Sequence, residues 1–296
     1  MISEPDVRTG QGHAWGAVSF VNAIPAGIGA SAAVALSCRV RVDLRPTQDG
    51  DPTRVQVGGQ DPNPLLRRIV EDTLRKIGEA RPWDIRVVVD SHIPSGKGLK
   101  SSSAVSVALA SALGSALDRY LNPEELARLS ADAAISSGTS VTGAYDDALT
   151  VASGGVHVVD AHGRKELLST EMPAGVVAVL WIPEVSHASV DELRARFHPF
   201  AERGNMAGEF AAHGELLRAM AINTEIVEEA LSYDVKGLRE AGQKAGALAS
   251  GISGNGPALV FVAPKALAEA VVQGLPTAGA QVQTVAFVPK GGRFDE

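Results

Sequence analysis

The sequence predicts two α+β domains in one chain. Three observations indicate this class: a length of 296 residues, strand-like and helix-like stretches mixed along the whole chain, and an aperiodic segment near the middle. Domains commonly hold about 100–200 residues, so the length fits one large domain or two ordinary ones. Mixed strands and helices are typical of α+β domains. The aperiodic segment, residues 161–175, indicates the boundary, and we expect domains at 1–165 and 166–296.

The first domain is expected to begin with β-structure over residues 12–45. Apolar and polar residues alternate from Val34 to Leu44, with Val40 and Val42 on one face and Arg41 on the other. A period of two is that of a half-buried strand. The following residues, 46–62, are rich in Pro, Gly, Asp and Gln, so we expect turns around one short strand there.

Two helix starts carry specific local signals. Asn63 is a good N-cap, Pro64 suits the first helical position, and apolar residues then recur at helical spacing to Ile77. Asn122 is a second N-cap, with Glu125 at the third helical position, which is the pattern of a capping box.

The remaining elements follow from the same two periodicities. Apolar, β-branched runs predict strands at 85–90, 156–159, 176–182, 258–262 and 282–288. Helical spacing predicts helices at 101–120, 205–231, 235–249 and 264–274. A capping signal, Ser189 with Glu192 as its partner, predicts one further helix that begins after Ser189.

Composition excludes several classes of protein. The 27 Lys and Arg residues against 34 Asp and Glu residues give a net charge of −7, which argues against a nucleic-acid-binding protein. The single cysteine, Cys38, allows no internal disulfide and no cysteine-based zinc site. No apolar run reaches about 18 residues, and residues 1–11 lack the pattern of a signal peptide. We therefore expect a cytoplasmic protein without membrane or nucleic-acid partners; the sequence does not indicate an oligomeric state.

The most informative segment is the glycine-rich stretch 94–104, which follows a predicted strand and opens a predicted helix. Gly96 and Gly98 allow sharp turns, and a helix start offers unpaired N–H groups and partial positive charge. Such a site favours phosphate. The spacing fits neither a Walker A loop nor a dinucleotide-binding fingerprint. A glycine turn before a serine-capped helix remains the plain alternative.

Three segments together resemble the GHMP small-molecule kinases, which include galactokinases, homoserine kinases and mevalonate kinases. The segments are Gly12–Val18 running on to Ile24, Pro94–Ala104, and Ser250–Ala258. Within that superfamily the archaeal-type shikimate kinases are most similar. The features that suggest this branch are Gly-Leu-Lys-Ser-Ser-Ser at 98–103, the segment 140–148, and the segment 22–30.

The resemblance implies a two-domain α+β GHMP kinase fold, with an S5 domain 2-like N-terminal domain and a ferredoxin-like C-terminal domain. It also implies ATP and Mg²⁺ as cofactors and shikimate as the small-molecule substrate. ATP would be bound by Pro94, Ser95, Gly96, Lys97, Gly98, Leu99, Lys100, Ser101, Ser102, Ser103 and Ala104. Substrate would be bound by Asn22, Gly143, Asp146, Gly254, Asn255 and Gly256. Mg²⁺ would be held by Ser102, Ser103 and Asp132.

The resemblance implies a catalytic base in the pair Asp146-Asp147. The family spacing from the preceding glycine favours Asp146, which we prefer, whereas counting back from the glycines at 154–155 favours Asp147. Several family members carry an active-site lysine in the first motif, where this chain has Ala17, so Lys100 is the expected replacement. Two alternatives stay open: another GHMP kinase of the homoserine or mevalonate type, and a non-catalytic ligand sensor on the same fold.

Overall fold

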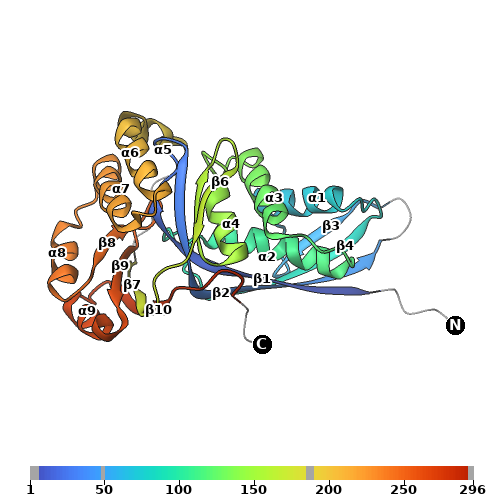
Figure 1. Cartoon of the computed structure of the whole chain (residues 1–296). Helices are drawn as coiled ribbons and strands as arrows, with labels where there is room; N and C mark the ends of the chain where they lie inside the picture. The colour runs from blue at the N-terminus through green and yellow to red at the C-terminus, as the bar shows by residue number, and fades with distance from the viewer. Residues whose placement is uncertain (1–6, 48–50, 185–189, 293–296) are drawn as a thin grey trace.

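The computed structural model describes residues 7–47, 51–184 and 190–292. Two antiparallel-rich sheets lie side by side, each covered by helices (Figure 1). The first sheet is built from β1 (Arg8–Val21), β2 (Ile28–Pro46), β3 (Arg54–Val57), β4 (Trp83–Ser91), β5 (Val156–Asp160) and β6 (Lys165–Thr170). Its order is β3-β4-β2-β5-β6, and β1 pairs with β2 along most of its length.

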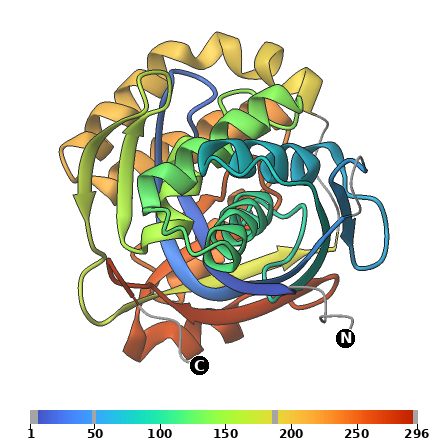
Figure 2. The same ribbon diagram turned by 90° about the vertical axis from the view of Figure 1, so that its right-hand side faces the viewer.

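Four helices belong to this first half: α1 (Pro64–Lys76), α2 (Ser101–Ala116), α3 (Pro123–Ser136) and α4 (Tyr145–Ser153). Helix α2 is apolar nearly all round and is buried at the centre of the surrounding elements, as the view almost along its axis shows (Figure 2). Its backbone lies directly against β1, because a Cβ on Gly12 would be 2.0 Å from the carbonyl oxygen of Ala108. The small residues of the chain therefore allow close helix–sheet packing.

The second sheet contains β7 (Val176–Pro183), β8 (Ala249–Ile252), β9 (Leu259–Pro264) and β10 (Ala280–Ala286), in the order β10-β7-β9-β8. Numbered from β7, this is the antiparallel order 4-1-3-2 of a ferredoxin-like domain, which confirms the expected fold class. The helices of this half are α5 (Val190–Phe197), α6 (Ala201–Ala212), α7 (Leu216–Leu231), α8 (Lys236–Lys244) and α9 (Ala268–Gly274), with 3₁₀ turns η1 (His198–Phe200) and η2 (Lys265–Leu267).

The two halves are interlocked rather than joined by one linker. After β10 the chain returns to the first sheet, where the N–H of Val288 donates to the carbonyl of Ala33 at 2.9 Å and the N–H of Gly155 donates to the carbonyl of Val288 at 2.9 Å. Strand β6 also pairs with β5, so the second sheet begins at β7, ten residues after the boundary that the sequence indicates.

Most predicted elements are present, with five differences. The helix expected over 205–231 is two helices separated at Gly214, and the helix expected over 235–249 gives way to β8 at Ala249. The helix expected at 101–120 ends at Ala116, and α4 and β6 were not predicted. The proposed cap Ser189 lies outside the described residues. Among those residues, no helix is long and apolar enough to cross a membrane.

Candidate active site

A pocket lies where the end of β1, the start of α2, the start of α4 and the turn after β8 meet. Its polar lining is dominated by hydroxyl and amide side chains together with one lysine and two aspartates. The residues of the glycine-rich stretch that line it are Pro94, Gly96, Gly98, Leu99, Lys100, Ser101, Ser102 and Ser103. The other predicted site residues that line it are Asn22, Asp146, Asp147, Gly254 and Asn255.

The turn before α2 contains three residues with a left-handed backbone conformation. Gly96, Gly98 and Lys100 all have positive φ, at +70°, +81° and +68°. Left-handed backbone is easy for glycine and strained for other residues. Because no side chain of the described residues caps α2, the first N–H groups of the helix remain available to a ligand. The geometry is therefore that of an anion-binding helix start.

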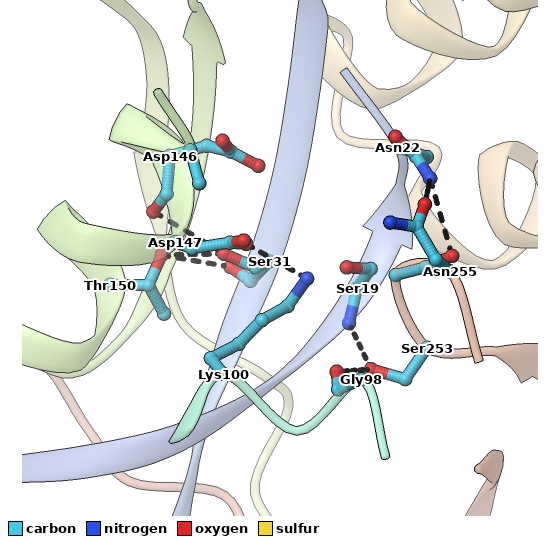
Figure 3. A network of polar contacts seen from close by, with 12 residues as sticks. Ser19, Asn22, Ser31, Gly98, Lys100, Asp146, Asp147, Thr150, Ser253 and Asn255 are labelled. Atoms are coloured by element: carbon cyan, nitrogen blue, oxygen red, sulfur yellow. Dashed lines mark hydrogen bonds and ion pairs between the residues drawn. The ribbon is translucent and has the colours of Figure 1, made fainter. Parts of the chain in front are cut away.

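The glycine-rich turn is held by the two other motifs. The hydroxyl of Ser253 donates to the carbonyl of Gly98 at 2.8 Å and accepts from the N–H of Ser19 at 3.0 Å (Figure 3). The N–H of Ala258 donates to the carbonyl of Lys97 at 3.2 Å. Residues more than 150 positions apart thus fix the path of the turn. The sequence places Ser253 within the third motif but indicates no role for its hydroxyl.

Lys100 and Asp147 form an ion pair inside the pocket. The Nζ atom of Lys100 lies 3.0 Å from Oδ1 of Asp147, and the two side chains are only 9% and 13% exposed. Limited exposure weakens screening by solvent and salt, so this pair differs from a surface salt bridge. The pocket therefore contains a cation, the ammonium group of Lys100, next to the glycine-rich turn.

Asp146 meets different surroundings from its neighbour. Its side chain is buried against the backbone of β2, where a Cβ on Gly29 would lie 2.2 Å from Oδ2 of Asp146. Burial, and secondarily the nearby charge of Asp147, raise the pKa of Asp146 to about 8, although Lys100 opposes the shift. Burial therefore favours the protonated form of the Asp146 carboxyl group.

Helix α4 carries both aspartates in its first turn, and its position is fixed at both ends. At its start, Gly143 has a φ of +83° and donates its N–H to the hydroxyl of Ser140 at 3.0 Å. Along its length, the hydroxyl of Ser31 on β2 donates to that of Thr150 at 2.8 Å. At its end, Ser153 lies 2.8 Å from Nε2 of His157, whose Nδ1 contacts Glu166. The sequence indicates no role for His157.

Several predicted residues lie outside the pocket. Lys97 donates from Nζ to the carbonyl of Glu184 at 2.7 Å, across to the second half of the chain. Gly256 packs against Tyr233 and shapes the turn after β8. Asp132 is exposed and pairs with Arg164, so the structure does not bring it to the other two predicted metal ligands. The remaining three, Ser95, Ala104 and Gly143, also do not line the pocket.

The described residues offer partial support for a magnesium ion. They contain no cluster of three or more His, Cys, Asp or Glu side chains that could hold a metal. Ser102 and Ser103 do line the pocket together with the two aspartates. Oxygen ligands of this kind suit Mg²⁺, which keeps several waters and binds largely through substrate phosphates. The donor set fits an ion that arrives with a nucleotide.

Two family models match parts of this chain. A model of the GHMP kinase N-terminal domain matches residues 64–155, and a model of the GHMP kinase C-terminal domain matches residues 203–281. A shikimate kinase of Archaeoglobus fulgidus is 35% identical over 88% of this chain and 86% of its own. A shikimate kinase of Pyrococcus abyssi is 33% identical over 88% of this chain and 94% of its own.

Solved structures show the same fold at lower identity. The homoserine kinase of Cytophaga hutchinsonii superposes with a TM-score of 0.74 at 19% identity, and the alignment covers 98% of each chain. The galactokinase of Lactococcus lactis, complexed with galactose, superposes with a TM-score of 0.71 at 12% identity over 94% of this chain and 93% of its own. At these identities the likeness concerns the fold alone.

Proposed function

Because the chain belongs to the GHMP kinase family, we propose that it is a shikimate kinase, which transfers the γ-phosphoryl group of ATP to the 3-hydroxyl of shikimate. The observation that carries the choice of substrate is the identity of 35% and 33% to two shikimate kinases over more than four fifths of each chain. The homoserine kinase that superposes on the chain is only 19% identical, so it supports no rival substrate.

In the proposed reaction, the turn at Gly96 and Gly98 and the first N–H groups of α2 bind the phosphates of ATP. Phosphoryl transfer depends mainly on alignment and on neutralising phosphate charge. Lys100 supplies a fixed positive charge at the rim of this turn, and Ser102 and Ser103 are the hydroxyls that would hold Mg²⁺. When bound, Mg²⁺ would neutralise further charge on the transferring phosphate.

We propose Asp147 as the base, although the sequence had favoured Asp146. Asp147 faces Lys100 as the partner of an ion pair, whereas burial raises the pKa of Asp146 and favours its protonated form. A protonated acid cannot accept the hydroxyl proton. As the oxygen of the 3-hydroxyl bonds to the γ-phosphorus, its proton passes to Asp147 and ADP leaves with the bonding electrons.

The test is ADP production by the purified chain with ATP and Mg²⁺, comparing shikimate, homoserine and mevalonate as acceptors. We expect turnover with shikimate at least a hundredfold faster than with the other two, and a product heavier by one phosphoryl group by mass spectrometry. Faster turnover with homoserine or mevalonate would make that compound the substrate in place of shikimate. Tight ATP binding without turnover on any acceptor would instead favour a ligand sensor.

A further inference from the structure

One part of the pocket lining is apolar and comes from both domains. Its side chains belong to three separate segments: Ile24 after β1, Val141 before α4, and Leu193 on α5. Leu193 and Phe197 are buried on one face of α5, whereas residues 194–196 between them are exposed. Ile24 and Val141 pack against the apolar cluster that contains Leu193 and Phe197. These three pocket-lining side chains, the apolar wall, therefore form one hydrophobic surface.

The charged side chains of the pocket lie elsewhere in its lining. Among the described residues that line it, the charged ones are Lys100, Asp146 and Asp147, all from the first domain. An apolar side chain gives a phosphate oxygen no hydrogen bond, and removing a charged group from water without a partner is costly. The apolar wall is therefore unsuited to the phosphates of ATP, which have the glycine-rich turn and the start of α2 as their site.

The apolar wall adjoins the loop that positions the two aspartates. Val141 is held within this loop, since the N–H of Gly143 donates to the hydroxyl of Ser140 at 3.0 Å, and α4 with Asp147 in its first turn begins two residues after Gly143. In the proposed reaction the acceptor hydroxyl lies at Asp147, so the carbon skeleton of the acceptor is the part that reaches Val141. The base of ATP is separated from the γ-phosphate by two phosphates and a ribose, which places it farther away.

We propose that Leu193, together with Ile24 and Val141, contacts the carbon ring of the acceptor and selects a ring alcohol over an acyclic alcohol that carries an ammonium group. The proposal rests on the proposed function and refines it. A hydrophobic contact favours ring carbons without hydroxyls, and shikimate has such a carbon next to the one that carries its 3-hydroxyl. Homoserine carries its ammonium group close to its hydroxyl, and the apolar wall offers an ammonium group no hydrogen-bond acceptor.

Three variants test the contact with the acceptor. Leu193→Ala should raise the KM for shikimate about tenfold or more, because carbon atoms missing from a hydrophobic pocket change discrimination by about 10–200-fold. Leu193→Met conserves the volume of the side chain and should keep the KM within about threefold. Leu275→Ala is the matched control, since Leu275 belongs to the same apolar cluster and is 5% exposed but does not line the pocket. It should lower the melting temperature without changing the KM.

Two further measurements separate contact with the acceptor from other effects. The affinity of Leu193→Ala for ATP, measured by calorimetry without acceptor, should stay within about threefold of the unaltered value, because the wall does not bind ATP. A loss of ATP affinity equal to the rise in KM would place the nucleoside against the wall and overturn the proposal. Leu193→Asn introduces a polar amide of similar size, so the ratio of kcat/KM for shikimate to that for homoserine should fall about tenfold or more. General destabilisation would lower both kcat/KM values alike and leave this ratio unchanged.

A fourth variant keeps the proposal testable if Leu193→Ala does not fold. Val141 is only half-buried, so Val141→Ala is expected to fold, and it should raise the KM for shikimate about threefold or more. If the unaltered chain phosphorylates shikimate and both alanine variants of the wall keep its KM, the inference fails and the proposed function stands. If the unaltered chain does not phosphorylate shikimate, both fail together.

Discussion

Asp146 and Asp147 are neighbours in sequence, yet they face different surroundings because successive residues of a helix project about 100° apart. One carboxyl group is buried beside Gly29 and the other is paired with Lys100. Sequence spacing alone allowed either to be the base, since it counts positions and does not report which side of α4 meets β2. The assignment therefore needs the packing of α4 as well as its motif.

The raised pKa of Asp146 predicts a pH-dependent stability. In the folded chain this pKa is about 8, whereas in an unfolded chain it is near 3.8. At pH values between these two pKa values, the folded chain keeps a proton on Asp146 that the unfolded chain has lost. The free energy of unfolding therefore falls as the pH rises. The asparagine of Asp146→Asn cannot ionise, so the free energy of unfolding of this variant should not fall with pH in this way. At pH 8 the variant should be more stable than the unaltered chain by about 1–3 kcal/mol. Urea unfolding at pH 5.5 and 8 measures the difference.

Asp147→Asn is the matched comparison for that experiment. It leaves Lys100 without its partner, so it should give no comparable gain at pH 8. Its turnover should also fall further than that of Asp146→Asn, because positioned proton transfer contributes about 10²–10⁴-fold. Equal pH profiles for Asp146→Asn and the unaltered chain would refute the buried, protonated state of Asp146.

At the scale of elements, the glycine-rich turn combines two separate requirements. Gly96 and Gly98 both need positive φ, but only Gly98 is also crowded. A Cβ on Gly98 would lie 2.0 Å from the carbonyl oxygen of Ser253, whereas one on Gly96 would meet nothing within 4 Å. The first glycine thus serves the turn, and the second also serves the contact between two distant motifs.

Because only Gly98 is crowded, substitution by alanine should have a larger effect on stability and ATP binding at Gly98 than at Gly96. Gly96→Ala should cost about 1–2 kcal/mol of stability, the strain of left-handed backbone. Gly98→Ala should cost clearly more, and it should weaken ATP binding at least tenfold because the turn must move away from Ser253. Urea unfolding and calorimetry with ATP and Mg²⁺ measure both quantities. Equal losses in the two variants would show that the close approach to Ser253 does not matter.

The elements that the sequence predicted well are those with local causes. The caps at Asn63 and Asn122 form as expected, with side chains that accept from Leu66 and Glu125 at 2.9 and 3.0 Å. Helix α4 escaped prediction because it is nine residues long and follows Ala144, which adopts positive φ despite its side chain. Strand β6 escaped because its residues are partly or fully exposed and lack an apolar alternation.

At the scale of the whole molecule, the pocket depends on contacts between segments that the sequence keeps far apart. Ser19 and Ser253 are 234 positions apart, and Asn22 and Asn255 are 233 apart. The motifs could be recognised separately from the sequence, and they proved to be neighbours. Which atoms join them depends on the way in which β1 passes the turn after β8, and no local pattern reports that.

Ser253 offers a test of this long-range assembly. Its hydroxyl is the acceptor for the N–H of Ser19 and the donor to the carbonyl of Gly98, so Ser253→Ala removes the partner of one buried group, the Ser19 N–H, and of one half-buried group, the Gly98 carbonyl. Unsatisfied buried groups cost about 1–3 kcal/mol each. We therefore expect a clear loss of stability in urea unfolding, together with weaker ATP binding, because the glycine-rich turn loses its anchor.

Ser250→Ala is the matched control, since Ser250 is also buried in this region but its hydroxyl has no partner among the described residues. Removing a hydroxyl that makes no hydrogen bond should leave stability unchanged or slightly higher, and ATP binding unchanged. If both alanine variants lost the same stability and affinity, the losses would reflect general sensitivity of the β8 region. A loss confined to Ser253→Ala would mean that this one hydroxyl couples the second domain to the phosphate-binding turn of the first.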